Sequence, residues 1–465
     1  MDLDRDYLEA RLTALVEKHG VVGASLGVAL GDAQVFAAAG VLNRRTGEPA
    51  STESVFQIGS ITKVWTTTLA MQLVDEARLD LDEPITTYLP ELALADAGIP
   101  VGLTARHLMA HTSGLVGDFF PDTGRGEDCL ERFVAELRGL EAVHPLGATY
   151  SYCNAGFSLL GRLIEVISGA TWDEVLHEQL LHPLQLEAAG TFPEEALLWS
   201  AAVGHVGGEG AQLEVAPIWC LSRNVGPAGL IHARARDVVE FGRMHLRNGL
   251  GPDGSRLLSE RSSLAMRTPQ VAVPEPWSSG THAGLGWALW EWSGAPVYGH
   301  DGATIGQDAF FRVVPGAAGR PDLIIVLLCN GGAAGELYHD LFDEIASHYV
   351  DLRLPTSAQP PTPALVLSGA ELERYQGTYQ HESIVQEVHC EEHGLRLVTH
   401  LSGPVAMAVG SDTLETALVP IGDDCFVGHV AGLPGWTTVV FYRLADGRQY
   451  LHCGGRAAAK VGSRP

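Results

Sequence analysis

The stretch of residues 60–74 carries a single charge, that of Lys63. Its other side chains are apolar or weakly polar on every side, which is typical of a helix surrounded by a folded domain. The chain has only three lysines, so a lysine at this place needs an explanation. We therefore predict a central helix over residues 61–77, with Lys63 largely buried inside a large domain.

Two interpretations of Lys63 fit this stretch. Burial disfavours a charged ammonium and lowers its pKa, and a neutral lysine can act as a general base. Residues three apart lie on one face of a helix, so Ser60 and Lys63 can share a proton, which activates a serine nucleophile. Alternatively, Lys63 extends to the surface or pairs with a carboxylate, and lysine is rare because the composition favours arginine. This stretch alone does not decide between them.

The composition indicates a large globular protein. A chain of 465 residues with 46% hydrophobic residues suggests two or three domains with ample core. The net charge of −26 comes without a cluster of basic residues, which argues against nucleic acid and anionic membranes as partners. No segment approaches the roughly 18 apolar residues of a membrane span, and the acidic N-terminus does not resemble a secretory signal. We expect a cytoplasmic protein.

The cysteines and histidines give no sign of a disulfide framework or a metal site. Seven cysteines are scattered without a Cys-x-x-Cys pair, which indicates reduced thiols. His177 and His182 resemble a zinc-binding helix, but they are five residues apart rather than four and so do not share a face. We therefore expect no metal and no cofactor.

The order of predicted elements divides the chain into domains. An N-terminal helix precedes two strands joined by a hairpin signal at Gly31-Asp32, and strands return only after a long helical block. The two ends of this region therefore contribute to one sheet that flanks an all-helical insert. The strands are predicted at residues 22–30, 33–41, 285–292, 297–298, 309–314 and 323–328, and the later helices at 105–110, 127–140, 155–168, 172–181, 235–247 and 333–349.

A proline-rich segment, residues 353–364, is predicted to be a linker, because such segments stay extended and join neither neighbouring core. Short strand-like runs follow it, typical of a small antiparallel barrel or sandwich. We therefore predict a first domain in residues 1–352 and a second in residues 365–465.

Other segments carry reactive groups whose meaning is ambiguous in isolation. Residues 23–27 match the Gly-x-Ser-x-Gly nucleophile elbow, but Ser25 lies within a predicted strand and lacks the strand–turn–helix context. Tyr152 and Asn154 precede a predicted helix, where they can relay a proton and hold a carbonyl, or simply pack and cap the helix. The segment 300–302, His-Asp-Gly, follows a strand and is either a site element or, given the glycines at 299, 302 and 306, a bulge or a close backbone approach.

Taken in this order, the motifs resemble the Ser-x-x-Lys serine hydrolases, in the branch of the class C β-lactamases and penicillin-binding-protein-like enzymes. Ser60 and Lys63 match the first motif, Tyr152 and Asn154 match a Tyr-x-Asn element, and His300 opens the third motif, which is often Lys-Thr-Gly. Segments 111–115 and 226–230 look like family loops bordering the site. The resemblance covers roughly residues 5–350 and implies an α+β fold, a β-lactamase/transpeptidase-like domain with an antiparallel sheet flanked by helices and an all-helical subdomain.

This resemblance implies a role for each matched side chain. Ser60 would be the acylated nucleophile, and Lys63 and Tyr152 its proton-transfer partners, with either one as the base. Asn154 would bind the substrate amide. His300 would contact the substrate or Tyr152.

Backbone groups of the site follow from the same resemblance. The N–H groups of Ser60 and Ala303 would form the oxyanion hole, which fits the unpaired N–H groups and positive dipole end at the start of a helix. Gly229 and Gly302 would border the bound substrate. Histidine is a weaker, pH-dependent substitute for the lysine that helps hold a β-lactam carboxylate. The motif therefore implies the esterase, D-amino-acid amidase and thioesterase-like branches rather than efficient β-lactam hydrolysis.

The second domain is similar to the lipocalin-like barrel appended to some of these enzymes. The combination most resembles the penicillin-binding-protein-type thioesterases, stand-alone enzymes that release and macrocyclise nonribosomal peptides. It implies that Ser60 takes a peptidyl chain from a carrier-protein thioester, often with a D-residue at the acyl end, and that the peptide's own amine closes the ring. Arg456 would hold a substrate carbonyl or carboxylate if the last strand faces the cleft, although a salt bridge at the barrel end is the favoured alternative.

Two further hypotheses remain. The first is a cytosolic D-aminopeptidase, amidase or esterase of the same fold, because water and amine compete for one acyl-enzyme. The second is a binding protein whose barrel captures an apolar ligand while the large domain is an idle scaffold. The complete set of Ser60, Lys63, Tyr152 and Asn154 argues against the scaffold.

Overall fold

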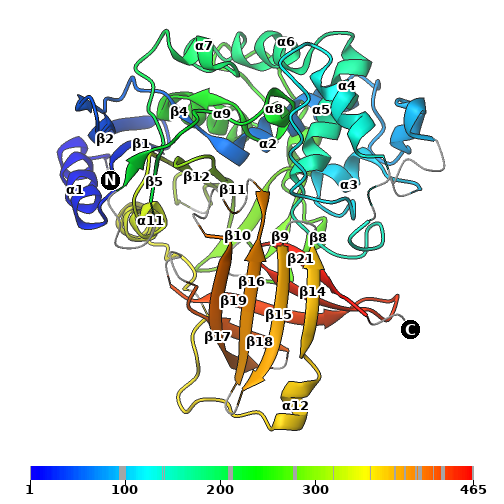
Figure 1. Cartoon of the computed structure of the whole chain (residues 1–465). Helices are drawn as coiled ribbons and strands as arrows, with labels where there is room; N and C mark the ends of the chain where they lie inside the picture. Colours follow the sequence, from blue (N-terminus) through cyan, green and yellow to red (C-terminus); the bar gives the residue numbers. More distant parts are fainter. Residues whose placement is uncertain are drawn as a thin grey trace.

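The computed structural model shows an α/β domain with an eight-stranded barrel beneath it (Figure 1). Among the residues that it describes, no helix has the length and apolar character that a membrane crossing requires. The described residues are 2–93, 101–138, 140, 142–207, 213–275, 280–317, 319–356, 358–381, 384–391, 394–403, 406, 411–422, 424–430 and 435–462.

A nine-stranded antiparallel sheet organises the α/β domain, in the order β3-β2-β1-β13-β12-β11-β10-β9-β8. Two neighbouring strands, β1 and β13, come from opposite ends of the domain and are buried along their whole length. The predicted closure of one sheet around a helical insert is therefore confirmed. The strands are β1 (Gly23–Leu30), β2 (Ala33–Asn43), β3 (Glu48–Pro49), β8 (Val271–Ala272), β9 (His282–Ala283), β10 (Ala288–Trp292), β11 (Ala295–Ala303), β12 (Asp308–Val314) and β13 (Leu323–Cys329).

Each face of the sheet has its own hydrophobic core. Helices α1 (Arg5–Lys18) and α11 (Ala334–Val350) cover one face, and α9 (Ala235–Leu246) covers the other, where the helical subdomain is attached. Helix α2 (Thr62–Asp75) lies inside this second core, and Trp65 stacks on Phe241 of α9 with ring centroids 4.1 Å apart. The prediction of a central buried helix is confirmed.

The helical subdomain follows the predicted pattern with local differences. Helix α5 (Asn154–Ser168) ends at Gly169, whose positive φ of 77° gives the left-handed C-cap that glycine favours. Helix α6 (Trp172–Leu176) continues as a π-helical turn, His177–Leu181, and no group of three or more potential metal ligands occurs in the described part of the chain. The other helices are α3 (Ala105–Met109), α4 (Cys129–Glu136), α7 (Pro193–Ala196), α8 (Gly226–Gly229) and α10 (Glu260–Met266).

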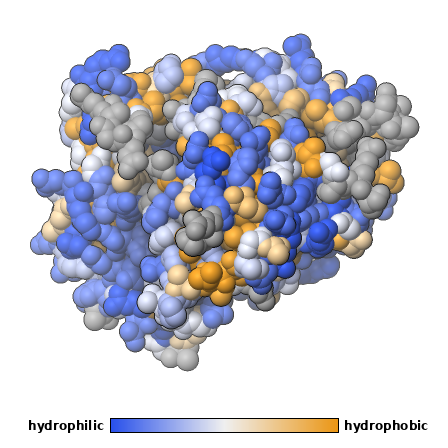
Figure 2. Space-filling model, turned by 60° about the horizontal axis from the view of Figure 1, so that its bottom comes forward, coloured by the Kyte–Doolittle hydropathy of each residue, from blue (hydrophilic) through white to orange (hydrophobic). Residues whose placement is uncertain are grey.

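The second part of the chain is a closed antiparallel barrel, so the barrel rather than the sandwich is correct. It follows residues 351–368, which have no regular structure where described (residue 357 lies outside the described residues), and the short helix α12 (Gly369–Glu373). Seen from the barrel side, the surface is largely hydrophilic with scattered apolar patches (Figure 2). The strands are β14 (Gly377–His381), β15 (Ile384–Glu391), β16 (Gly394–Leu401), β17 (Thr413–Gly422), β18 (Cys425–Gly428), β19 (Thr437–Arg443), β20 (Gln449–Cys453) and β21 (Arg456–Lys460).

One turn of the barrel, residues 454–456, docks on the α/β domain just before α5, and we call it the barrel tip. The carbonyl of Gly455 accepts a 2.8 Å hydrogen bond from the backbone N–H of Tyr152. The N–H of Ala457 donates to the Ser151 hydroxyl over 3.1 Å. The barrel therefore holds the backbone of a predicted site residue.

Some sequence predictions need correction. Strand β11 runs through His300 to Ala303, whereas the sequence pattern predicted a strand that ends before His300. Of the two structural explanations for the glycines at 299 and 302, a bulge or a close backbone approach, the close approach is correct: other backbone segments pack tightly against the strand at both positions. Ser25 lies fully buried within β1, which agrees with its rejection as a nucleophile. The seven cysteines, all of them described, are free.

Candidate active site

Ser60 and Lys63 lie on one helical turn at the start of α2. Ser60 belongs to a 3-10 turn, Gly59–Ile61, that leads directly into the helix. The Lys63 Nζ is 2.9 Å from the Ser60 Oγ and donates to the Ala228 carbonyl over 2.6 Å. Lys63 has 0% exposure, so the alternative in which it extends to the surface is wrong. Its polar partners are a hydroxyl and a carbonyl rather than a carboxylate.

The environment of Lys63 favours its neutral form. Burial holds the pKa of Lys63 well below its ordinary value, and the positive charge of Arg456 lowers this pKa further. The carboxylate of Asp118 partly opposes these effects. A neutral Nζ within hydrogen-bond distance of Ser60 Oγ can take the proton of the serine hydroxyl.

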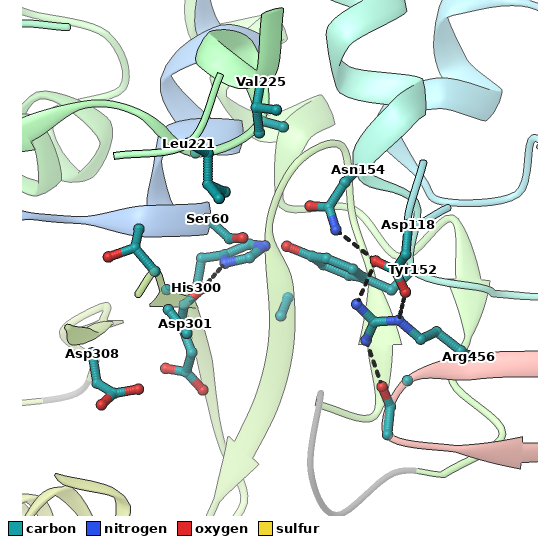
Figure 3. A pocket seen from close by; sticks show the side chains of 18 of the residues that line it. Ser60, Asp118, Tyr152, Asn154, Leu221, Val225, His300, Asp301, Asp308 and Arg456 are labelled. Carbon is teal, nitrogen blue, oxygen red and sulfur yellow. Dashed lines mark hydrogen bonds and ion pairs between the residues drawn. The ribbon is translucent and has the colours of Figure 1, made fainter. Parts of the chain in front are cut away.

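Tyr152 lies on the other side of Ser60, with its hydroxyl directed toward the serine (Figure 3). Its ring stacks on His111 at a centroid distance of 4.4 Å, and the Lys63 Nζ is 4.9 Å from the ring centroid. Burial raises the pKa of Tyr152 above its ordinary value, while the Ser60 side chain acts in the opposite direction. Tyr152 is therefore a neutral phenol that can pass a proton between Ser60 and the substrate.

Asn154, Asp118 and Arg456 form a hydrogen-bonded cluster beside Tyr152 (Figure 3). The Asn154 amide donates to Asp118 over 2.9 Å, and the Arg456 guanidinium donates to the same carboxylate over 2.5 and 3.0 Å. Burial raises the pKa of Asp118, but the charge and hydrogen bonds of Arg456, together with His381 and the Asn154 amide, hold it below its usual value. Asp118 thereby links a predicted substrate-binding residue to the barrel.

Two alternatives from the sequence are revised by this cluster. Asn154 is not the N-cap of α5, because Cys153 takes that position and its Sγ accepts from the Gly156 N–H. The expected salt bridge of Arg456 exists, but it crosses to the α/β domain instead of remaining at the barrel end. The guanidinium also lines the pocket, with its carbon 5.3 Å from the Tyr152 ring centroid.

The third motif brings His300 and two glycine-dependent contacts to the site. The His300 ring lies 6.0 Å from the Tyr152 ring, and burial lowers the pKa of His300 to about 3, so its imidazole is neutral. A Cβ on Gly302 would lie 2.0 Å from the Ile58 carbonyl oxygen, and one on Gly59 would lie 2.6 Å from the Ala303 nitrogen. Glycine is required at both positions. The Ser60 turn and the end of β11 consequently pack backbone to backbone, as the predicted oxyanion hole requires.

These elements surround a pocket of about 460 Å³. A second cavity of about 480 Å³ adjoins it and shares four apolar residues with it, namely Phe120, Leu221, Val225 and Ile305. Lys63 lies behind Ser60, and the other predicted site residues line the pocket itself. They are Ser60, Tyr152, Asn154, Gly229, His300, Gly302, Ala303 and Arg456.

The comparisons with known proteins agree with this geometry. The sequence profile of the β-lactamase family matches residues 8–349. Penicillin-binding protein 4 of Amycolatopsis lactamdurans is 43% identical over 384 residues, which are 82% of this chain and 99% of that protein. The chain belongs to the β-lactamase family. Its membership of the penicillin-binding-protein-like branch indicates a serine hydrolase.

Some solved structures match this chain over the barrel as well as over the β-lactamase-like domain. The crystal structure of SurE matches with a TM-score of 0.77 at 29% identity, covering 98% of this chain and 99% of SurE. The structure of SurE with D-Leu has a TM-score of 0.74. A D-stereospecific amidohydrolase from Streptomyces sp. matches at 25% identity with a TM-score of 0.57, covering 73% of this chain and 99% of that protein. The two-part fold predicted from the sequence is confirmed.

Sequence reasoning missed three contributors to the site. Asp118 is a single carboxylate in a loop, and nothing near it in the sequence points to Arg456 or Asn154. The Gly455 carbonyl is a backbone group, which no residue type reveals. His111 falls in a segment that resembles a family loop, but its contacts were not predictable; its Nδ1 accepts from the Cys153 N–H over 2.9 Å.

Proposed function

We propose that this family member is a serine acyltransferase that takes a peptidyl chain from a thioester onto Ser60 and releases it by macrocyclisation. The observation that carries the proposal is the pocket, because the barrel tip forms one wall of the nucleophile's cavity and the cavity continues into a second one. Their combined size suits a ligand of several residues rather than a small ester.

Acylation uses the groups around Ser60. The Ser60 Oγ attacks the thioester carbonyl carbon while Lys63 or Tyr152 accepts its proton. The N–H groups of Ser60 and Ala303 stabilise the oxyanion. The carbon–sulfur bond then breaks, and the thiol leaves with the proton that the serine gave up.

Deacylation reverses the proton flow. The amine of the same peptide attacks the ester carbon, the bond from that carbon to Ser60 Oγ breaks, and the amine's proton returns to Oγ through Tyr152 or Lys63. Water competes with the amine for the same ester. Apolar walls such as Phe120, Leu221 and Val225, together with the docked barrel, limit access of water and so favour the amine.

The acyl end of the substrate is proposed to be a D-residue. SurE has been crystallised with D-Leu, and the Streptomyces amidohydrolase is D-stereospecific. Arg456 is proposed to bind another carbonyl of the peptide or a carboxylate elsewhere in the substrate. The resemblance to penicillin-binding-protein-type thioesterases further suggests that the donor is a carrier protein of a nonribosomal peptide synthetase and that the enzyme works in the cytoplasm.

A second candidate is hydrolysis of D-peptides, D-amides or esters at the same serine. The likeness to a D-stereospecific amidohydrolase favours it, because Ser60, Lys63 and Tyr152 serve water as well as an amine. The barrel separates the two candidates, since that amidohydrolase matches only 73% of this chain.

The test is mass spectrometry of the products and of the protein after reaction with a peptidyl N-acetylcysteamine thioester. Substrates ending in a D-residue and in its L-epimer are compared with a p-nitrophenyl ester and nitrocefin. Cyclic product that requires Ser60 supports the proposal, and hydrolysis without ring closure supports the second candidate. If neither the substrates nor a fluorophosphonate modify Ser60, the protein is a binding scaffold.

A further inference from the structure

The carboxylate of Asp308 lies in the same pocket as the nucleophile. Asp308 is the first residue of β12 and the cross-strand partner of Ala303, whose N–H is expected in the oxyanion hole. Such partners have Cα atoms about 4.5–5.5 Å apart. Figure 3 shows Asp308 and Arg456 on opposite sides of Ser60. The pocket therefore has a cationic end at the barrel tip and an acidic end at β12.

The side chains at the acidic end of the pocket lie on one face of the sheet. Side chains alternate along a strand, so Asp301 and Ala303 of β11 share a face with their partners Phe310 and Asp308 of β12. All four residues line the pocket, together with Trp290 of β10. His300 and Gly302 point to the other face, toward Tyr152 and the Ser60 turn. The Ser60 turn and Asp308 therefore approach β11 from opposite faces of the sheet, and both line the pocket at the end of this strand, at Ala303.

The charges at this end do not balance. Arg312 neutralises Asp301 through two hydrogen bonds of 2.5 and 2.9 Å, and its guanidinium stacks on Trp290 at 3.9 Å. The Asp308 carboxylate has no ion pair or side-chain hydrogen bond within the described part of the chain. Burial and the neighbouring Asp301 raise the pKa of Asp308 to about 6, because both disfavour its charged form.

We propose that Asp308 binds an alkylammonium group of the substrate, beside the ring of Phe310. A partly desolvated carboxylate gains from a cation, and an aromatic ring next to it adds to the attraction. The inference rests on the proposed function, in which this ammonium is the free amino terminus of the peptide. Asp308 holds the terminus in the pocket as an ammonium, which gives up one proton to solvent before the neutral amine attacks the ester carbon. Asp308 is thus a positioning and selectivity residue for the ring-closing amine.

The test compares substrates that differ only in the ammonium. One linear peptidyl N-acetylcysteamine thioester ending in a D-residue is made with a free amino terminus, with an acetylated terminus, and with an acetylated terminus plus an internal lysine. The rate of thiol release gives kcat/KM for acylation of Ser60. Asp308→Asn removes the charge at the site. Glu291→Gln is the matched control, because Glu291 is an exposed carboxylate of β10 outside the pocket.

The wild-type enzyme should prefer the free amine over the acetylated peptide by about tenfold in kcat/KM, mainly through KM. Asp308→Asn should reduce this ratio to about one, and Asp308→Glu should restore most of it, whereas Glu291→Gln should keep it. If the acetylated peptide with an internal lysine regains the higher kcat/KM, Asp308 also binds a side-chain ammonium. If it does not, the site is specific for the amino terminus. An unchanged ratio in Asp308→Asn, or no preference in the wild type, would overturn the proposal.

A pair of p-nitrophenyl esters, 4-aminobutyrate and butyrate, separates this inference from the proposed function. If no thioester acylates Ser60, the proposed function fails. The ester pair still measures whether Asp308 selects an ammonium, because it needs only the nucleophile. Loss of the ammonium preference in Asp308→Asn with the esters would support the site on its own.

Discussion

The Ser60 turn and the barrel tip both reach the pocket, but different forces hold them there. The Ser60 turn enters α2, which is buried along nearly its whole length, and Lys63 contacts Ser60 within one helical turn. The barrel tip is a turn between two barrel strands in which Gly454 and Gly455 have positive φ angles of 58° and 79°. Its charged residue, Arg456, stays 27% exposed and relies on one carboxylate, Asp118, from the other domain.

We therefore expect the Ser60 turn to carry the chemical step and the barrel tip to position the substrate. Core packing fixes the nucleophile and its proton acceptor, so changes there should abolish turnover while the fold persists. An ion pair and a few backbone hydrogen bonds fix the barrel tip, so changes there should weaken domain docking and substrate binding together. The variants below test this division.

The largest effect is expected for Ser60→Ala. Removal of the nucleophile should reduce kcat by at least about 10³-fold and abolish the acyl-enzyme in mass spectra. Stability should change little, because Ser60 lies at the pocket rather than within the core. Ser25→Ala is the matched control: the buried Ser25 Oγ has no hydrogen-bond partner in the described structure, and its loss should leave activity intact. Turnover that survives in Ser60→Ala would refute the assigned nucleophile.

Lys63→Met should separate activity from stability. We expect a loss of about 10³-fold in kcat, because Ser60 loses one of its two proton-transfer partners. The folded protein holds the pKa of Lys63 far below the 10.5 of the unfolded chain. Below pH 10.5 the unfolded state therefore binds the proton more readily, and Lys63 destabilises the fold increasingly as pH falls toward its folded pKa.

The methionine variant should consequently raise the free energy of unfolding by roughly 1 kcal/mol at pH 7 and by less at pH 10, measured by urea denaturation at both pH values. Lys18→Met is the control, since Lys18 is exposed and should shift stability by less than about 0.5 kcal/mol. A methionine variant that is less stable at pH 7 would mean that the hydrogen bonds of Lys63 outweigh its desolvation.

The same division explains what the sequence could predict. Ser60 and Lys63 were recognisable because their contact spans three residues and the surrounding stretch lacks other charges. The end of the helix predicted at residues 155–168 was recognisable for an equally local reason, because a glycine, Gly169, directly follows it. The Arg456–Asp118 pair was not recognisable, because 338 residues separate its partners and neither has a distinctive neighbourhood. Strand β11 was predicted too short, since the need for glycine at 302 arises from the distant carbonyl of Ile58.

Asp118→Asn should have a smaller and broader effect than changes at Ser60 or Lys63. It removes the charge that Arg456 pairs with and alters the acceptor of the Asn154 amide. We expect a loss of roughly 1–3 kcal/mol in stability and of about 10- to 100-fold in kcat/KM, because an unpaired guanidinium remains partly buried. The readouts are urea denaturation and the KM of a D-residue thioester.

The double variant Asp118→Asn/Arg456→Gln tests whether this cluster works as a unit. Its stability loss should be smaller than the sum of the two single losses by about 1 kcal/mol, the coupling expected of contacting charges. Strictly additive losses would contradict a functional link between the barrel tip and Asp118.

The smallest expected effect is a shift in the pH dependence of kcat/KM, caused by the charge of the barrel tip acting on Lys63. Acylation needs a neutral proton acceptor, so kcat/KM should fall at low pH as the coupled Lys63–Tyr152 pair takes up a proton. We call this fall the acid limb of the pH profile. Arg456 lowers the pKa of Lys63, and Asp118 raises it. Arg456→Gln removes the first influence and leaves the second unopposed, so the acid limb should move to higher pH, by about half a unit.

His300→Gln is the control for this shift, because the pKa of His300 is near 3 and its imidazole stays neutral over the working range. The acid limb of the His300→Gln profile should lie at the same pH as that of the wild type, even if the maximal kcat/KM changes. A limb that moves in His300→Gln but not in Arg456→Gln would place the titrating group in the third motif. The barrel tip would then act on the substrate alone, without tuning the base that the α2 core encloses.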